Sequence, residues 1–322
     1  MIMNTKIEML KKRSDLLRQV RAFFYARDVI EVDTPLLSQA ATPDLHLSSL
    51  KTQALVPGEG ELTYYLHTSP EYPMKRLLCE GSGDIFYLGK VFRNGDLSPR
   101  HQIEFTMLEW YRLGFSMEQL IDEVIQLVNS VLPEKRAIQC LTYEQAFEQY
   151  AGLSNVFKAS PQAMKACLSA HQVPEIVGVD EGDAQLWEQL ILTEVIEPKL
   201  GQDEITVLTH FPAREAALAN LSKDNPETAE RFEVFVNGLE LANGYDELAK
   251  AELYRSRFEA SLSARLQSNL PSVPLDENLL EILTTKPLPP CSGVALGLDR
   301  LFMLQQGENQ IESVLPFNAL NA

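Results

Sequence analysis

Apolar residues in the first part of the chain recur with the spacing of a helix. Between residues 7 and 27 they fall three or four positions apart among Lys, Arg and Asp, which predicts an amphipathic helix ending near Asp28. A β-like stretch over 29–34 follows, and Pro35 closes it because proline has no N–H to donate to a sheet ladder. The helical pattern returns over 117–132, and this second helix is expected to cover a sheet.

Short β-rich runs lie between these two helices. Strands are predicted over 62–66, 85–93 and 102–113, with a helix over 72–79, and we interpret the strands as parts of one antiparallel sheet. From about 141 to 200 the pattern is helical and polar, and it contains no set of residues that suggests chemistry. We interpret this segment as a helical insertion.

The sheet resumes in the last third of the chain. The elements predicted there are strands over 205–210, 232–236 and 239–243, a long helix over 246–267, and a glycine-containing strand that runs into a helix over 293–306. Together the pattern predicts an α+β fold: a single domain over residues 1–322 that is mostly antiparallel sheet flanked by helices.

Composition narrows the classes of partner. The 322 residues include 28 Lys and Arg against 45 Asp and Glu, a net charge of −17 that repels phosphate backbones, so tRNA is not expected as a partner. The four cysteines are scattered, as in a reduced cytoplasmic protein. No stretch reaches the roughly 20 apolar residues of a spanning helix, and the N-terminus has no secretory apolar segment, so neither a membrane nor export is expected.

Two polar side chains interrupt an apolar face of the strand predicted over 102–113. Alternate residues of a strand share one face, and on the odd-numbered face only Glu109 and Tyr111 are polar. A buried carboxylate needs a partner, because leaving it unpaired costs several kcal/mol or forces it to take up a proton. The partner is either the ammonium group of a ligand or an internal Lys or Arg, and the pattern alone leaves both open.

A hairpin is predicted where Asn237 and Gly238 separate two apolar runs. This turn places Glu240 on the same face as Glu233, diagonally about 7 Å away. Two like charges so placed favour a cation between them, and Mg²⁺ bridging nucleotide phosphates suits such oxygen ligands. The alternative is two solvated glutamates on an exposed hairpin.

Small residues alternate along the strand that begins at Gly293. Gly293, Ala295 and Gly297 share a face that a flat ligand or another backbone can approach closely, and Arg300 opens the following helix. An arginine there can pair with a phosphate or stack on a base. The alternative is tight packing without any ligand.

In this order, these units resemble motifs 1, 2 and 3 of the class II aminoacyl-tRNA synthetases, and most of all the lysyl subgroup. The strings that carry the resemblance are TSPE at 68–71, KRL at 75–77, FRN at 92–94, RH at 100–101, EFTMLEWY at 104–111, ELANGYDEL at 240–248 and GVALGLDRL at 293–301. Within that subgroup the chain is most similar to the elongation factor P lysine ligases, stand-alone paralogues that attach (R)-β-lysine to a lysine side chain. The first motif begins near residue 15 and leaves no room for an anticodon-binding domain, and the acidic balance agrees.

The resemblance implies an ATP site with two catalytic arginines. Arg93 would hold the α-phosphate, Phe105 and Arg300 would sandwich the adenine, and Arg100 would lie near the γ-phosphate with Arg300. Glu233 and Glu240 would carry Mg²⁺. The implied ATP contacts are Arg93, Asn94, Gly95, Arg100, His101, Gln102, Phe105, Glu240, Leu241, Gly297 and Arg300.

The resemblance also implies a pocket for a lysine-type amino acid. Glu109, Tyr111 and Glu247 would receive the side-chain ammonium, and Ser69 and Glu71 would lie near the other amino group. The methyl group of Ala295, a position that is glycine in the synthetases, would narrow the pocket and favour a β-amino acid. The implied substrate contacts are Ser69, Pro70, Glu71, Glu109, Tyr111, Asn243, Glu247 and Ala295.

The chain departs from the family pattern at two places. The family has glutamate after Arg-Asn, where this chain has Gly95 followed by Asp96, and the family's His-Asn-Pro is replaced by residues 101–103, His-Gln-Ile. ATP binding is still expected, because the implied arginines, Phe105 and the metal carboxylates are all present.

The implied reaction has two steps, adenylation of lysine or β-lysine by ATP and transfer to an amine of the acceptor, elongation factor P, by a cytoplasmic homodimer. One alternative is a synthetase that makes a small amide, against which the acidic pocket speaks. A second is a catalytically silent regulatory paralogue. A third is a minimal tRNA-charging enzyme.

Overall fold

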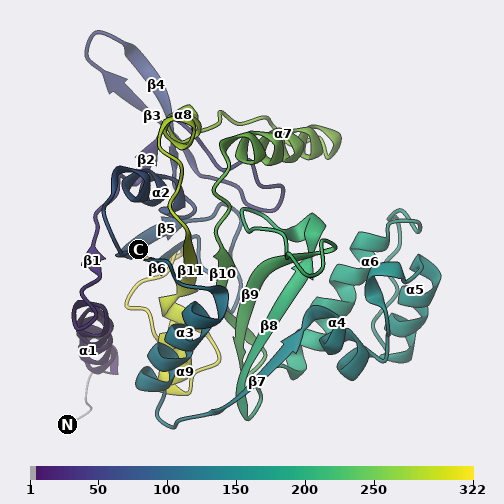
Figure 1. Ribbon diagram of the computed structural model, residues 1–322. Helices are drawn as coiled ribbons and strands as arrows, with labels where there is room; N and C mark the ends of the chain where they lie inside the picture. The colour runs from purple at the N-terminus through teal and green to yellow at the C-terminus, as the bar shows by residue number, and fades with distance from the viewer. Residues whose placement is uncertain (1–4) are drawn as a thin grey trace. The chain divides into compact units, whose positions relative to one another are not determined.

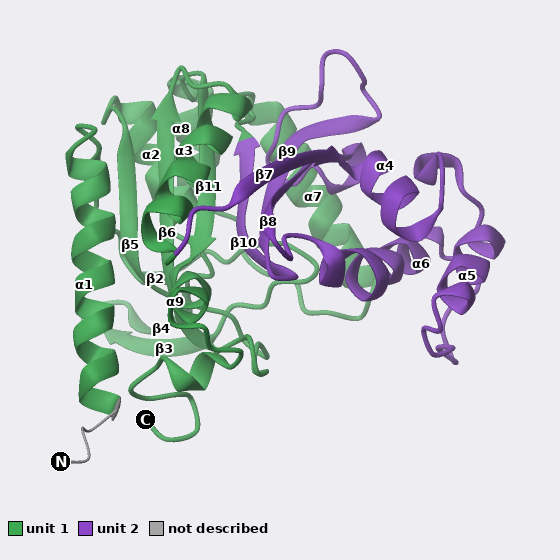
Figure 2. Cartoon of the chain, turned by 90° about the horizontal axis from the view of Figure 1, so that it is seen from below, with its two compact units in different colours: residues 1–133, 246–322 green, residues 134–245 purple. Residues whose placement is uncertain are grey.

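The computed structural model describes residues 5–322, which form two compact units. Unit 1 comprises residues 1–133 and 246–322, and unit 2 comprises residues 134–245 (Figure 2). The elements of both are labelled in Figure 1. No helix among the described residues is both long and apolar enough to span a bilayer.

Unit 1 contains a four-stranded part of a sheet. Its strands lie in the order β1-β5-β6-β11, with β1 parallel to β5 and the other neighbours antiparallel. Their bounds are Ile30–Glu31 (β1), Ile85–Phe92 (β5), Glu104–Leu113 (β6) and Cys291–Gly297 (β11). The predicted strands over 85–93, 102–113 and the start of 293–306 are therefore confirmed.

A separate three-stranded sheet holds the remaining strands of unit 1. It consists of β2 (Leu37–Ser38), β3 (Lys51–Val56) and β4 (Gly60–Leu66) in the order β2-β4-β3. The prediction that the strand over 62–66 belongs to the same sheet as 85–93 was wrong. A tight turn with a Glu59 N–H to Val56 carbonyl bond of 3.0 Å pairs β4 with β3, and a local β pattern does not identify a strand's partner.

The helices of unit 1 belong to both of the chain segments that form this unit. They are α1 (Thr5–Tyr25), α2 (Glu71–Glu80), α3 (Met117–Val131), α7 (Ala251–Gln267), α8 (Glu277–Thr285), α9 (Leu298–Gln306) and a 3₁₀ turn at Ile311–Ser313. A capping box formed by Ser116 and Gln119 starts α3. The helix predicted over 246–267 begins later, at Ala251, because Asp246 ends a strand and the Glu247 N–H bonds to the Cys291 carbonyl at 3.0 Å.

One face of the unit 1 sheet is the aromatic core. Phe24 of α1 stacks on Phe86 of β5 with ring centroids 4.7 Å apart and meets Trp110 of β6 edge-on at 5.2 Å. The Trp110 indole N–H donates to Glu123 of α3 at 3.0 Å. Since neighbouring strand residues point to opposite faces, Glu109 points away from this core.

Unit 2 contains a second four-stranded part of a sheet, in the order β10-β9-β8-β7, with β7 parallel to β8. The strands are β7 (Ala137–Thr142), β8 (Glu204–Pro212), β9 (Thr228–Val236) and β10 (Leu239–Asp246). Its helices are α4 (Tyr143–Ala146), α5 (Pro161–Ala170), α6 (Ala184–Ile191), π-helical turns at Phe147–Ala151 and Leu192–Ile196, and 3₁₀ turns at Val156–Lys158, Glu197–Lys199 and Ala213–Glu215.

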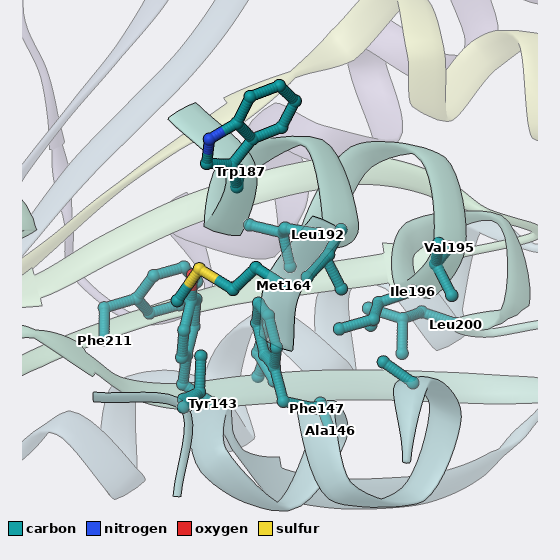
Figure 3. Packing of buried hydrophobic residues seen from close by; sticks show 14 of the residues in the cluster. Tyr143, Ala146, Phe147, Met164, Trp187, Leu192, Val195, Ile196, Leu200 and Phe211 are labelled. Carbon is teal, nitrogen blue, oxygen red and sulfur yellow. The ribbon is translucent and has the colours of Figure 1, made fainter. Parts of the chain in front are cut away.

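An apolar core joins these helices to the strands of unit 2. Tyr143, Phe147 and Phe211 pack together with Trp187, and their side chains are buried (Figure 3). The Tyr143 hydroxyl donates to the buried Glu188 at 3.0 Å. The domain organisation, a single domain with an insertion at 141–200, stays a prediction.

Candidate active site

The Glu109 carboxylate lies at the centre of the predicted amino-acid pocket. It comes from β6 and is 2% exposed. The Ser69 hydroxyl donates to one carboxylate oxygen at 2.7 Å and the Tyr111 hydroxyl to the other at 2.8 Å. Ser69 itself accepts a 3.0 Å bond from the Glu71 N–H at the start of α2. The structure thus brings these four residues together.

A buried lysine joins the same cluster. Lys75 of α2 is fully buried, and its ammonium lies 2.6 Å from a carboxylate oxygen of Glu71 and 2.6 Å from one of Glu247. Lys75 is not among the site residues predicted above. A signal existed, because Glu71 and Lys75 are spaced i,i+4 across the predicted helix, a spacing at which opposite charges pair.

The acidic residues of this cluster differ in whether a cation of the protein pairs with them. Glu71 and Glu247 pair with the internal cation Lys75. Over residues 5–322, no Lys or Arg nitrogen lies within 4.0 Å of the Glu109 carboxylate. Glu109 is held by neutral donors alone.

Burial dominates the protonation of the cluster. It raises the pKa of Glu109 to about 7, Glu71 adds to the rise, and the hydrogen bonds from Ser69 and Tyr111 oppose it. Burial also raises the pKa of Glu247, against the effect of Lys75. For Lys75, burial lowers the pKa, but Glu247 and Glu71 outweigh it and the pKa lies well above its ordinary value.

The small residues of strand β11 lie opposite the cluster residues of β6. Gly293 lies opposite Tyr111, Ala295 opposite Glu109, and Gly297 opposite Met107. A Cβ atom on Gly293 would lie 2.3 Å from the Tyr111 ring and 2.5 Å from a carboxylate oxygen of Glu247, so only glycine leaves room for these two side chains. Ala295 is half-buried beside Glu109.

Of the predicted nucleotide contacts, Phe105 lies further along the same face of β6 as Glu109, with Arg93 beside it. Phe105 is four residues before Glu109, which is about 14 Å along a strand. The Arg93 guanidinium lies over the Phe105 ring, 5.1 Å from its centroid. At the start of α9, Arg300 bonds to the His101 ring at 2.5 Å and its Nε donates to the Arg100 carbonyl at 3.4 Å.

The two departures from the family pattern lie in the loop between β5 and β6. Gly95 has φ +89°, a left-handed conformation in which a glutamate would be strained. Gln102 is 2% exposed and its carbonyl oxygen accepts a 3.1 Å bond from the Ala319 N–H. Asn94 is exposed, and its N–H donates to the Ser48 carbonyl at 2.8 Å.

A buried ion pair fixes the residues that neighbour Phe105 and Arg300 in the sequence. Asp299, 1% exposed, precedes Arg300 and lies 2.6 Å from Arg13 of α1. It also accepts a 2.8 Å bond from the Thr106 N–H of β6, and Arg13 donates to the Thr106 hydroxyl at 2.7 Å. This link ties the residues beside Phe105 and Arg300 to α1.

Unit 2 contains the other predicted site residues, Glu233, Glu240, Leu241 and Asn243. The hairpin pairs Val236 with Leu239 and Phe235 with Glu240, as predicted from its turn. A bulge then shifts the register, and Asn243 lies opposite Glu233. Leu241 is buried at 2% exposure.

Glu233 has a partner that the sequence analysis missed. Arg231, two residues earlier on the same face of β9, lies 2.5 Å from one of its oxygens, and the Asn243 amide donates to that oxygen at 3.4 Å. Burial raises the pKa of Glu233 to about 8, Arg231 opposes the rise, and Glu240 adds to it.

The donor set of this hairpin suits Mg²⁺ in one arrangement only. Within the described residues, no group of three or more His, Cys, Asp or Glu could hold a metal ion. Mg²⁺ is commonly held by one or two carboxylates together with substrate phosphates and water. Glu233 and Glu240 fit that arrangement as the protein's share of the ligands.

The chain belongs to the class II aminoacyl-tRNA synthetases, since the family model described as tRNA synthetases class II (D, K and N) matches residues 2–321. This confirms the predicted fold class and the resemblance. The chain is 42% identical over 317 residues to an elongation factor P–(R)-beta-lysine ligase of Haemophilus influenzae strain PittGG, covering 98% of the chain and 96% of that protein. Proteins of the same name from Pseudoalteromonas translucida (42% over 323 residues, 99% and 98%) and Salmonella gallinarum (41% over 315 residues, 98% and 96%) are similarly related.

Proposed function

We propose that this chain activates (R)-β-lysine with ATP and transfers it to a lysine side chain of elongation factor P. Relatives with that name are 41 to 42% identical to it over nearly the whole length of both proteins. The small-amide synthetases, the first alternative, handle no cationic side chain, and the acidic pocket favours one.

The Glu109 carboxylate carries the proposal. It is buried, has two neutral donors and no protein cation within 4.0 Å among the described residues, so a ligand ammonium is the partner that it requires. Together with Glu71 and Glu247 it makes three carboxylates against the single ammonium of Lys75. When all are ionised the excess is two negative charges, which matches the two ammonium groups of a diamino acid.

The distance to the nucleotide end fits an aminoacyl-adenylate. Glu109 and Phe105 share one face of β6 and lie about 14 Å apart, a span comparable to an extended amino acid joined to AMP. A substrate whose side-chain ammonium binds at Glu109 would therefore present its carboxylate toward Arg93.

In the first step, a carboxylate oxygen of the amino acid attacks the α-phosphorus, and the bond from that phosphorus to the pyrophosphate oxygen breaks. Arg93 would neutralise the charge that moves across the α-phosphate, and Arg300 would hold the nucleotide. Mg²⁺, held by Glu233 and Glu240, would supply further charge neutralisation on the phosphates when bound.

In the second step, the neutral amine of the acceptor lysine attacks the carbonyl carbon, AMP leaves, and the amine loses a proton to solvent. No covalent enzyme intermediate is required, so catalysis comes from positioning and charge stabilisation. A net charge of −17 on this chain disfavours a nucleic acid as the acceptor.

We further propose a cytoplasmic homodimer that does not bind tRNA. The dimer follows from the resemblance of the first motif to that of the family. Absence of tRNA recognition is supported by the acidic balance of the chain.

The test is to incubate the purified protein with ATP, each lysine isomer and purified elongation factor P, and to measure the mass of elongation factor P by mass spectrometry. The expected result is a mass increase of one lysyl group, greatest with (R)-β-lysine. Glu109→Gln is the matched control, because it keeps the shape of the side chain and removes the charge. Failure of every lysine isomer to support ATP–pyrophosphate exchange would favour the silent paralogue instead.

A further inference from the structure

We propose that Lys75 is a positioning residue of the amino-acid pocket, which holds the side chains of Glu71 and Glu247 in place for the ammonium groups of the substrate. The inference deepens the proposed function and rests on it, because it requires an amino acid that carries two amino groups. The residue itself makes no contact with the substrate in this proposal.

The contacts of Lys75 join two elements that are far apart in the sequence. Glu71 begins α2, one turn before Lys75, whereas Glu247 lies in the segment between β10 and α7. Each has one oxygen 2.6 Å from the same ammonium. The ring of Tyr254 on α7 covers the ammonium from another side, with its centroid 5.3 Å away. Lys75 therefore fixes where both carboxylates lie.

Lys75 is the cation among many acidic neighbours. The titratable groups that interact with it from the elements packed around it are Glu71, Tyr72 and Cys79 of α2, Glu109 of β6, Glu247, Tyr254 of α7 and Cys291 of β11, and Tyr111 of β6 shares the cluster. None of these groups is a base that gains positive charge. Lys75 thus supplies a positive charge that opposes the effect of burial on the carboxylates of Glu109 and Glu247.

Folding stability alone does not account for this arrangement. A buried ion pair costs desolvation free energy that its attraction often does not recover, and apolar residues of similar volume are often equally stable or more stable. Two buried carboxylates, Glu109 and Glu247, and the partly buried Glu71 beside one lysine are a worse arrangement for stability than an apolar core. Their role is therefore in binding a cationic ligand, and the role of Lys75 is to keep them in place.

Removal of the positive charge has a specific expected effect. Without Lys75 the buried carboxylate of Glu247 loses the cation that favours its ionised form, so a proton takes its place and one acceptor for the ligand is lost, while Glu71 loses the partner that holds it in position. A hydrogen bond to a charged group is worth enough for a loss of roughly tenfold or more in affinity. The nucleotide end, about 14 Å away along β6, should be little affected.

The experiment compares Lys75→Gln and Lys75→Met with the wild type in ATP–pyrophosphate exchange, varying the amino acid and ATP separately. We expect the KM for the amino acid to rise about tenfold or more and the KM for ATP to stay within about twofold. In Lys75→Gln, the amino-acid KM should also fall more steeply than in the wild type between pH 6 and 9, since alkaline pH restores the carboxylate of Glu247. The glutamine amide keeps hydrogen-bond donors in place without charge.

Arg265→Met is the matched control for the loss of a buried cation. Arg265 of α7 is 4% exposed and donates to the backbone carbonyls of Asp44 at 2.7 Å and Pro271 at 3.1 Å, and no carboxylate of residues 5–322 lies within 4.0 Å of its guanidinium. It should lower the thermal stability and leave both KM values near those of the wild type.

Three outcomes would overturn the proposal. In the first, folded Lys75→Gln has an unchanged amino-acid KM. In the second, its two KM values rise together. In the third, both Lys75 variants unfold while Arg265→Met folds, which would make Lys75 a stability residue. If the wild type itself shows no exchange with any lysine isomer, the proposed function fails first, and the two failures are thereby distinguished.

Discussion

The protonation of Glu109 is the first consequence at the scale of single residues. Its pKa lies at about 7 instead of 4.5, chiefly because it is buried. Between pH 4.5 and 7, Glu109 binds a proton in the folded chain but not in the unfolded chain. The protonated carboxyl group therefore makes its full contribution to folding stability below pH 4.5, and that contribution is lost as the pH rises through 7. A bound ammonium group reverses this preference, because it favours the ionised carboxylate.

We therefore predict that the affinity for the lysine-type substrate rises with pH up to about 7 and then levels. The change should approach about tenfold per pH unit below that value. Titration of binding by calorimetry from pH 5.5 to 8.5 measures it, and Glu109→Gln should bind weakly at every pH. A flat profile in the wild type would show that Glu109 is already ionised.

Gly293 and Gly297 form a matched pair for a test of packing. In Gly293→Ala the new methyl group would meet the Tyr111 ring and Glu247 at 2.3 and 2.5 Å, whereas in Gly297→Ala it would meet Arg300 at 3.6 Å, an ordinary contact. We predict that Gly293→Ala costs about 1–3 kcal/mol of stability and weakens amino-acid binding, and that Gly297→Ala costs less than about 1 kcal/mol. Urea unfolding with and without the amino acid measures both, and equal effects would contradict the prediction.

Ala295 is expected to decide between α- and β-amino acids. It lies directly opposite Glu109 across the β6–β11 ladder and is half-buried. We predict that Ala295→Gly relaxes selectivity toward α-lysine, because loss of the methyl group widens the proposed pocket beside Glu109. The ratio of kcat/KM for the two isomers is the measurement, and an unchanged ratio would remove the methyl group from the explanation of selectivity.

The residues themselves were more readily predicted than their partners. The odd-numbered face of β6 and the small residues of β11 follow from strand alternation, and the ladder brings them together as expected. Lys75 and Arg231 were not predicted as partners, although they lie close in sequence to Glu71 and Glu233, with which they pair. A sequence pattern shows that a buried carboxylate needs a partner, but burial decides which nearby cation supplies it.

At the scale of elements, the link between Asp299, Arg13 and Thr106 joins α9, α1 and β6. Arg13 is largely buried, so loss of the Asp299 charge would leave its guanidinium without its carboxylate partner. We predict that Asp299→Asn lowers the free energy of unfolding by about 3 kcal/mol or more. Chemical unfolding measures it, and the matched control is Asp15→Asn.

Asp15 pairs with Arg18 on the exposed side of α1, where the two side chains are 66% and 76% exposed. Removal of this pair should cost less than about 1 kcal/mol, because solvent screens exposed ion pairs. Similar costs for the two variants would show that the buried link does not support the fold.

The sequence predicted most elements of regular structure and fewer of their relationships. The Asn237–Gly238 turn gave the correct hairpin register, since both residues adopt positive φ, 53° and 65°. The bulge that follows was not predicted, because it depends on how β10 is packed. The strands β2 and β7 and the helix α8 were not predicted either, because the hydrophobic residues of these short segments show too little periodicity.

At the scale of the whole molecule, ordered motifs spread from about residue 15 to 305 were sufficient to identify the family. The division of the predicted site was not apparent from them: Glu233, Glu240, Leu241 and Asn243 belong to unit 2, and the other predicted contacts to unit 1. Motif order follows the chain, whereas compact units follow contacts. The acidic balance was readable from composition alone, and its expected consequence is that filter binding detects no complex with lysine tRNA.

The two faces of β6 contact different parts of the protein, and this difference has a practical consequence for protein engineering. Trp110 belongs to the aromatic core on one face, while Glu109 and Tyr111 lie on the other, where the amino-acid pocket is proposed. Variant libraries for new amino acids should therefore randomise odd-numbered positions such as 109, 111 and 295, and leave their even-numbered neighbours intact. A deletion of one residue in this strand would exchange the faces, sending a carboxylate into the aromatic cluster and an indole into the pocket.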